Sequence, residues 1–203
     1  MIAVIDYGIN NLESVKNALD KLGMTFIVTS DIAAMQSADT LILPGVGSAS
    51  EGMKNLKKLN LDKAIISEVK KRKPILGICL GMQLLMSDSE EGGVDCLGLM
   101  EGKVQKFKGE TKIPQIGWNS ISFRDDTYAQ RLTEGIPNNS YFYFVHSYYC
   151  KPNDTNVVKG ITLYGQDYCS LFVKDNIVGV QFHPEKSGTV GFQLLKNVIN
   201  YFI

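Results

Sequence analysis

The sequence has no excess of charge of either sign, because its 21 Lys and Arg residues are balanced by 21 Asp and Glu residues. It also lacks a block of basic residues, so we expect neither a nucleic-acid partner nor binding to a membrane. No apolar run is long enough to cross a bilayer, and the first residues lack the charged n-region of a signal peptide. These absences favour a cytoplasmic protein.

Paired cysteines and histidines are also scarce. The four cysteines, at positions 79, 96, 150 and 169, form no C-x-x-C motif, which argues against a disulfide framework and against a zinc site. We expect free thiols in a reducing compartment, with no metal and no organic cofactor. The chain has two histidines, His146 and His183, so a reaction that needs an imidazole base has two candidates.

The 203 residues fit one domain, and we predict a single domain over residues 1–203. In the first half, short apolar runs at 2–5, 26–28 and 40–43 alternate with helical patterns at 11–22 and 54–71, the second interrupted near Asn60. Buried strands that alternate with helices are typical of an α/β protein, with a mostly parallel central sheet flanked by helices.

The second half is richer in glycine and in short β-like runs. These runs lie at 104–107, 120–123, 141–145, 157–163, 169–173 and 177–182. Their spacing predicts an added antiparallel, β-rich portion that shares one sheet with the first half. A final helix is predicted over 189–202, where apolar residues repeat at helical spacing.

The stretch 74–86 predicts a buried strand, a sharp turn at Cys79 and then a helix. Gly77 and Gly81 flank the cysteine two residues away on either side, as in the nucleophile elbow, with sulfur in place of a hydroxyl. The free N–H groups at the start of the helix favour a thiolate and a developing oxyanion. The alternative is that Cys79 is a small core residue.

A cysteine nucleophile needs a base, and the base needs an orienting group. His183 precedes Pro184, which favours an extended backbone at His183. Residues two apart in an extended segment face the same side, so the Glu185 carboxylate is expected to reach the His183 ring. The alternative is a histidine at a strand end beside a solvated glutamate.

Three further features are candidates for the same site. The glycine-rich loop 44–48 follows a predicted strand and could supply a backbone N–H to an oxyanion, or it could be a simple turn. Gln83 lies four residues after Cys79, on the same helix face, where it could bind a polar substrate or remain partly exposed. Ser147 and Tyr148 end an aromatic strand and could border the cleft.

Taken together, Gly77-Ile-Cys-Leu-Gly-Met-Gln83 and Gln181-Phe-His-Pro-Glu185 resemble the motifs of the class I (triad) glutamine amidotransferases. A narrower resemblance, to the glutaminase subunits of imidazole glycerol phosphate synthase, covers nearly the whole chain. It rests on Asp6-Tyr-Gly8, Asn11-Leu-Glu-Ser-Val15, Leu43-Pro-Gly-Val-Gly-Ser48, Pro114-Gln-Ile-Gly-Trp-Asn119, Tyr143-Phe-Val-His-Ser-Tyr148 and His183-Pro-Glu-Lys-Ser187.

The resemblance implies a reaction and a set of roles. Cys79 would attack the side-chain amide of L-glutamine, His183 would be the base and Glu185 would orient it. The resemblance also assigns the oxyanion donors, which would be backbone N–H groups of Leu80 and of the Val46-Gly47 turn. It assigns the substrate contacts to Gln83, Ser147 and Tyr148.

The resemblance also implies a partner. The ammonia would pass through a channel to a barrel-type synthase (cyclase) subunit, bound as a heterodimer, that makes imidazole glycerol phosphate and aminoimidazole carboxamide ribotide in histidine biosynthesis. A flexible loop at 44–47 would explain a free subunit that is poorly active until the partner binds.

Two departures from the family pattern concern the partner. Asn10 stands where the family usually has Gly, and Gln115 where it often has His; we associate both regions with the synthase interface. The departures leave the catalytic assignment unchanged and concern only which synthase is the partner. Three alternatives stay open in all. These are a paralogous glutaminase that feeds a sugar-amidating synthase for surface polysaccharide, a cysteine peptidase-like hydrolase, and a catalytically silent regulatory subunit.

Overall fold

The computed structural model describes residues 1–9, 11–109 and 111–202, so Asn10 lies outside the described residues. Its helical segments are α1 (Leu12–Lys21), α2 (Ile32–Ser37), α3 (Ala49–Lys58), α4 (Leu61–Lys70), α5 (Leu80–Leu84), α6 (Thr127–Leu132) and α7 (Gly188–Phe202), with 3-10 turns η1 (Thr155–Val157) and η2 (Pro184–Lys186). The strands are β1 (Ile2–Ile5), β2 (Phe26–Thr29), β3 (Thr40–Gly45), β4 (Ile75–Cys79), β5 (Met86–Ser89), β6 (Val94–Asp95), β7 (Met100–Lys106), β8 (Gln115–Ser120), β9 (Ser122–Phe123), β10 (Tyr141–His146), β11 (Tyr148–Pro152), β12 (Val158–Leu163), β13 (Asp167–Lys174) and β14 (Ile177–Val180).

The central part of the main sheet is parallel, in the order β2-β1-β3-β4-β14. The sheet continues from β14 through the antiparallel strands β13 and β11 to β7. Because β14 pairs with β4, the second half of the chain joins the sheet built by the first half. The predicted α/β class, with a mostly parallel sheet and an antiparallel extension, is confirmed.

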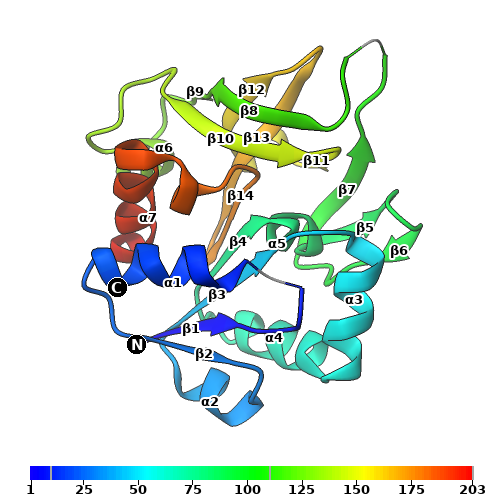
Figure 1. Ribbon diagram of the computed structural model, residues 1–203, viewed down its shortest axis with the longest axis vertical. Coiled ribbons are helices and arrows are strands. Elements are labelled where there is room, and N and C mark those ends of the chain that lie inside the picture. Colours follow the sequence, from blue (N-terminus) through cyan, green and yellow to red (C-terminus); the bar gives the residue numbers. More distant parts are fainter. Residues whose placement is uncertain (10, 110, 203) are drawn as a thin grey trace.

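Helices cover both faces of the parallel strands (Figure 1). Alternate residues of β1 point to opposite faces, so Ile2 and Val4 pack with α1 and α7, whereas Ala3 and Ile5 pack with α3 and α4. Each face therefore has its own buried apolar cluster, and the functional loops follow the carboxyl ends of the strands, where ligands bind in such sheets.

The helices differ from the prediction mainly in where they begin. α3 begins at Ala49, five residues before the predicted start at 54, because the Ser48 hydroxyl accepts a hydrogen bond from the Glu51 N–H at 3.3 Å and caps the helix. The predicted break near Asn60 is confirmed, since Asn60 has a φ of 56° between α3 and α4. Helices α2 and α6 and strands β5, β6, β8 and β11 were not predicted.

Strands β8 and β10 do not belong to the main sheet. They form a separate antiparallel pair, so the prediction of one shared sheet is wrong for these two strands. Three large side chains on this pair are exposed, Ile116 by 63%, Trp118 by 55% and Tyr141 by 60%. In the part of the chain that the structure describes, no helix combines the length and apolarity that crossing a bilayer would require.

Candidate active site

Cys79 ends β4, and α5 begins at the next residue. The cysteine has a φ of 54° and a ψ of −109°, a backbone conformation that L residues rarely adopt. A Cβ on Gly81 would collide with the carbonyl oxygen of Leu43, and a Cβ on Gly77 would lie 2.8 Å from the Gly81 oxygen. The two glycines therefore make the strand-to-helix turn possible, as predicted.

The turn reverses the direction of the Cys79 side chain. Successive strand residues normally point to opposite faces of a sheet, yet Ile78 and Cys79 pack in the same apolar cluster. The positive φ brings the sulfur toward β10, where it lies 3.8 Å from the Val145 carbonyl oxygen. The side chain is thereby taken out of the core under α5 and placed at the edge of a cavity.

His183 follows β14 and is bonded to Glu185. The Nδ1 atom lies 2.8 Å from the Glu185 Oε1 atom, and both side chains are 2% exposed. The contact forms differently from the prediction: His183 is extended, but Glu185 lies in the 3-10 turn η2 rather than in an extended segment. The segment is anchored on β10, because the His183 N–H donates to the Tyr143 carbonyl and the Ser187 hydroxyl accepts from the Tyr143 N–H.

The surroundings of His183 favour the imidazolium. Burial lowers its pKa, but the interactions with the Cys79 sulfur and with the Glu185 carboxylate outweigh burial and raise the pKa to about 10. The Nε2 atom is buried and has no hydrogen bond to another described residue. A thiol beside an imidazole that is itself paired with a carboxylate can form a thiolate–imidazolium pair, which attacks electrophilic carbon.

Cys79 lines a cavity of about 290 Å³. All six of the other residues predicted for the oxyanion hole and the substrate line the same cavity, namely Val46, Gly47, Leu80, Gln83, Ser147 and Tyr148. His183 and Glu185 are not among its lining residues; both side chains are buried, and His183 interacts with the Cys79 sulfur. The nine predicted site residues therefore meet in one region, although the strands that carry them are far apart in the sequence.

The predicted oxyanion donors are in different states. Leu80 is the first residue of α5, so its N–H has no acceptor four residues earlier within the helix. The Val46 N–H is already used, because it donates to the Ile9 carbonyl oxygen at 3.2 Å. Gly47 follows with a φ of 92°, a conformation that suits glycine. In this state the loop does not offer the Val46 N–H to the cavity.

Gln83 is buried, and the NH₂ group of its side-chain amide is hydrogen-bonded within the protein. Its Nε2 atom lies 2.9 Å from the Tyr148 carbonyl oxygen and 3.1 Å from the Gln181 Oε1 atom. Gln181 in turn places its Nε2 atom 3.8 Å from the Cys79 sulfur. The predicted substrate contact Gln83 is thus connected to the nucleophile through a side chain to which the sequence analysis assigned no role.

Four of the described residues that line the cavity were not predicted as site residues, namely Glu91, Pro114, Val145 and His146. Glu91 lines the cavity, and its carboxylate accepts a hydrogen bond from the Ala49 N–H at 2.7 Å; burial raises its pKa, and that hydrogen bond opposes the rise. His146 also lines it, with Nδ1 2.8 Å from the Tyr148 carbonyl oxygen. Burial lowers the pKa of His146 to about 4, so this ring is neutral near pH 7.

Gln115, one of the two departures from the family pattern, is described. It is buried, and its Oε1 atom lies 3.1 Å from the Tyr168 hydroxyl, so its side chain does not join the exposed face of β8. Among the described residues, no cluster of three or more His, Cys, Asp or Glu side chains could hold a metal ion.

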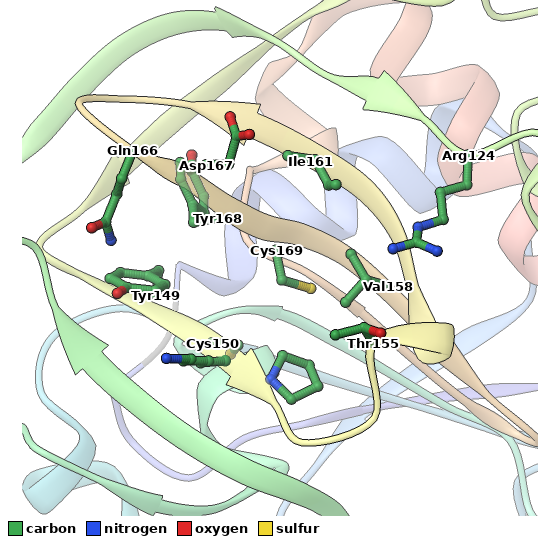
Figure 2. Close-up of a pocket in the computed structure, with 12 residues that line it drawn as sticks. Arg124, Tyr149, Cys150, Thr155, Val158, Ile161, Gln166, Asp167, Tyr168 and Cys169 are labelled. Carbon is green, nitrogen blue, oxygen red and sulfur yellow. The ribbon is translucent and has the colours of Figure 1, made fainter.

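A separate cavity of about 340 Å³ lies where β11 and β13 diverge from their single paired position, Cys150 opposite Cys169 (Figure 2). Burial raises the pKa of Cys169 to about 12 and holds that of Cys150 well above its usual range. Both thiols are therefore protonated near neutral pH. This cavity does not contain Cys79.

The sequence matches a family model. Residues 3–200 match the model described as Glutamine amidotransferase class-I. A turn at a buried cysteine, a histidine–glutamate pair behind it and a mostly parallel sheet fit this class. The chain belongs to the class I glutamine amidotransferase family.

Curated relatives narrow the family further. The chain is 47% identical over 198 residues to the imidazole glycerol phosphate synthase subunit HisH of Dehalococcoides mccartyi strain CBDB1, covering 97% of this chain and 95% of that protein. It is 44% identical over 204 residues to the HisH subunit of Chlorobaculum tepidum, covering 99% of this chain and 100% of that protein. Within the class, the chain is a member of the HisH subunit family.

Solved structures support the fold. A crystal structure described as a glutamine amidotransferase superposes with a TM-score of 0.77 at 16% identity, covering 100% of this chain and 99% of that chain. The glutaminase domain of Trypanosoma brucei CTPS with bound acivicin superposes with a TM-score of 0.68 at 14% identity, covering 98% and 93%. At these identities the likeness concerns the fold alone.

Proposed function

We propose that residues 1–203 act as one glutaminase domain that hydrolyses L-glutamine to glutamate and ammonia, and that the ammonia passes to a synthase subunit of the histidine pathway. The observation that carries the proposal is the meeting of Cys79 with the His183–Glu185 pair at the edge of a cavity of about 290 Å³. The names of the HisH relatives support the choice of pathway.

The reaction proceeds in two stages. The Cys79 sulfur attacks the side-chain amide carbon of glutamine, the thiol proton moves to His183 Nε2, and His183 gives a proton to the departing ammonia. Water then attacks the thioester carbon, with His183 as the base, and releases glutamate and the free thiol. The charge of Glu185 favours the protonated ring that both stages require.

The cavity has groups for each end of the substrate. The Glu91 carboxylate attracts the α-ammonium group, and Gln83 contacts a polar group of glutamine. Backbone at Ser147 and Tyr148 binds the amino-acid end. Glu91 was not predicted from the sequence, and its role follows from its charge and its place in the wall.

The partner would be a barrel-type synthase subunit, bound as a heterodimer. Paired residues of an antiparallel ladder face the same side, so Ile116, Trp118 and Tyr141 share one face of the β8–β10 pair. An exposed apolar face of this kind is typical of a protein–protein interface. Pro114 and Val145, next to this face, line the cavity, so a protein bound here would lie near the site of ammonia release.

Activation by the partner follows from the oxyanion loop. The Val46 N–H donates to the Ile9 carbonyl, so the peptide must turn before it can bind an oxyanion. Loss of one oxyanion donor typically costs a factor of about 10²–10³ in kcat. We therefore expect low turnover from the isolated chain and strong activation by the loaded synthase.

The test is reconstitution with a histidine-pathway synthase. Cys79→Ala should abolish glutamine-dependent synthesis and leave ammonia-dependent synthesis intact, whereas the matched control Cys96→Ala should support both. Loss of both activities in Cys79→Ala would mean a structural role for Cys79.

The same system separates the alternatives. Glutaminase activity without coupling to this synthase would favour a different partner, such as a sugar-amidating synthase. Cleavage of peptides without glutaminase activity would favour a hydrolase. Stimulation of the synthase by the wild type and by Cys79→Ala alike would favour a regulatory subunit.

A further inference from the structure

Three consecutive amide contacts lead from a backbone carbonyl to the nucleophile. The Tyr148 carbonyl oxygen is 2.9 Å from Gln83 Nε2, Gln83 Nε2 is 3.1 Å from Gln181 Oε1, and Gln181 Nε2 is 3.8 Å from the Cys79 sulfur. Gln181 is 0% exposed and Gln83 is 4% exposed, so water does not compete at the centre of this chain.

The carbonyl sets the direction of both amides. A carbonyl oxygen can only accept, so the Gln83 atom beside Tyr148 must be the NH₂ group. The same NH₂ group faces Gln181, and therefore the Gln181 atom beside it must be the oxygen. The other end of the Gln181 amide, the one beside the sulfur, is then an N–H donor. The donors and acceptors of the four groups therefore allow one orientation of each amide.

We propose that Gln181 is a positioning residue that holds an N–H donor against the Cys79 sulfur, in a direction set by Gln83 and Tyr148. A donor at this point stabilises the charged sulfur more than its neutral form. The backbone from which this side chain projects is also fixed, because the Gln181 N–H donates to the Ser170 carbonyl oxygen at 3.0 Å.

The same direction limits what Gln83 can do for a substrate. Both hydrogens of its NH₂ group are committed, to Tyr148 and to Gln181. Its Oε1 atom is left, so Gln83 accepts from the substrate and does not donate. It therefore selects an N–H group, the carboxamide or the α-ammonium of glutamine. This second part rests on the proposed function, whereas the contact with the sulfur does not.

Other titratable groups also interact with the Cys79 sulfur. His183, with Glu185 behind it, interacts with Cys79 from the end of β14. Burial is the main cause of the raised pKa values of Tyr7, Cys150 and Tyr168, and the interaction of each with Cys79 adds a smaller increase. Because these groups stay the same in Gln181 variants, a difference from the wild type reports the amide.

The experiment measures the rate at which iodoacetamide alkylates Cys79 in the full chain between pH 5 and 10, with the site identified by mass spectrometry. Gln181→Met removes both ends of the amide at similar size, and Gln181→Glu keeps the shape but presents acceptors alone. Gln36→Met and Gln36→Glu make the same changes at an exposed position of α2 and serve as controls. Thermal unfolding of each variant reports whether it is folded.

We expect the pH midpoint of alkylation to rise by about one unit in Gln181→Met and by more in Gln181→Glu, which corresponds to a loss of about tenfold in rate below the midpoint. Gln83→Met should give a smaller rise, because Gln181 then loses the group that directs it. The Gln36 variants should match the wild type.

Folded Gln181 variants whose pH profile overlays that of the wild type would overturn the proposal. If the Gln181 variants do not fold, an unchanged profile in Gln83→Met would overturn it instead. If the pH midpoint of alkylation rises in Gln181→Met but not in Gln83→Met, Gln83 does not set the direction of the Gln181 amide. A chain with the expected profiles that releases no glutamate from glutamine, with or without a partner, would refute the proposed function and leave the role of Gln181 intact.

Discussion

Replacement of Glu185 by glutamine tests the charge balance behind the nucleophile. The change removes a charge but almost no volume, at a side chain that is 2% exposed and 2.8 Å from the His183 ring. The pKa of His183 rises from 6.5 to about 10, which corresponds to roughly 5 kcal/mol shared between the Cys79 sulfur and Glu185, net of burial. A hydrogen bond to a charged group contributes about 1.5–3 kcal/mol. Glu185→Gln should therefore lower the pKa of His183 by about one to two units.

The measurement is direct because the chain has two histidines. The imidazole C2–H signals can be followed by NMR from pH 4 to 11 and assigned with His146→Asn. His183 should titrate near 10 in the wild type and one to two units lower in Glu185→Gln, and His146 near 4 in both proteins. The control Glu134→Gln makes the same chemical change at an exposed position and should leave His183 unchanged.

Stability should follow the same charge. A raised pKa means that the protonated ring stabilises the folded state fully below pH 6.5 and that this stabilisation is lost as the pH rises through about 10. Glu185→Gln should therefore cost about 2 kcal/mol in free energy of unfolding at pH 6, and less at pH 10. A His183 midpoint that is the same in both proteins, or an equal cost at both pH values, would refute this account of the pair.

Three shorter predictions concern packing and the second histidine. Gly81→Ala should lower the free energy of unfolding, measured with denaturant, by about 3 kcal/mol or more, because the new Cβ meets a backbone carbonyl. The control Gly52→Ala should lower it much less, because there the Cβ meets a flexible leucine side chain at 3.1 Å. Equal losses would contradict the close approach at Gly81. Tyr7→Phe should raise the free energy of unfolding by about 1 kcal/mol, because the buried hydroxyl of Tyr7 has no hydrogen bond in the described chain. A loss of stability would show that the hydroxyl is bonded. His146→Asn should leave alkylation of Cys79 at pH 7 within a few-fold of the wild type, while His183→Asn should slow it by about 10²; similar losses would mean that the neutral ring acts as a base.

The sequence predicts the parts of the site that depend on local chemistry. The two glycines around Cys79 predict a tight turn on steric grounds alone. The turn is present, and Cys79 has a positive φ. Pro184 makes His183 extended, and Glu185 does reach the ring. The backbone between them differs from the prediction, because the contact joins an extended residue, His183, to a residue inside the 3-10 turn that follows it. Local geometry therefore predicted the contact but not the backbone that makes it.

The parts that were missed depend on residues distant in the sequence. Glu91 enters the cavity because its carboxylate binds the Ala49 N–H, across 42 residues of sequence, and no local pattern distinguishes it from Glu90. The orientation of the Val46 peptide is set by the Ile9 carbonyl on another loop. β5 and β6 are short, partly polar strands whose pairing, rather than their propensity, makes them strands.

The β8–β10 pair has a consequence for how such a subunit can change over time. β10 offers Tyr141 to the outside and, through the Tyr143 backbone, anchors the segment that bears the imidazole. A substitution that shifted the register of this ladder to suit a new neighbour would also displace the proton acceptor. Adaptation to another neighbour should therefore proceed through side chains on the outer face, with the backbone of β10 kept in place.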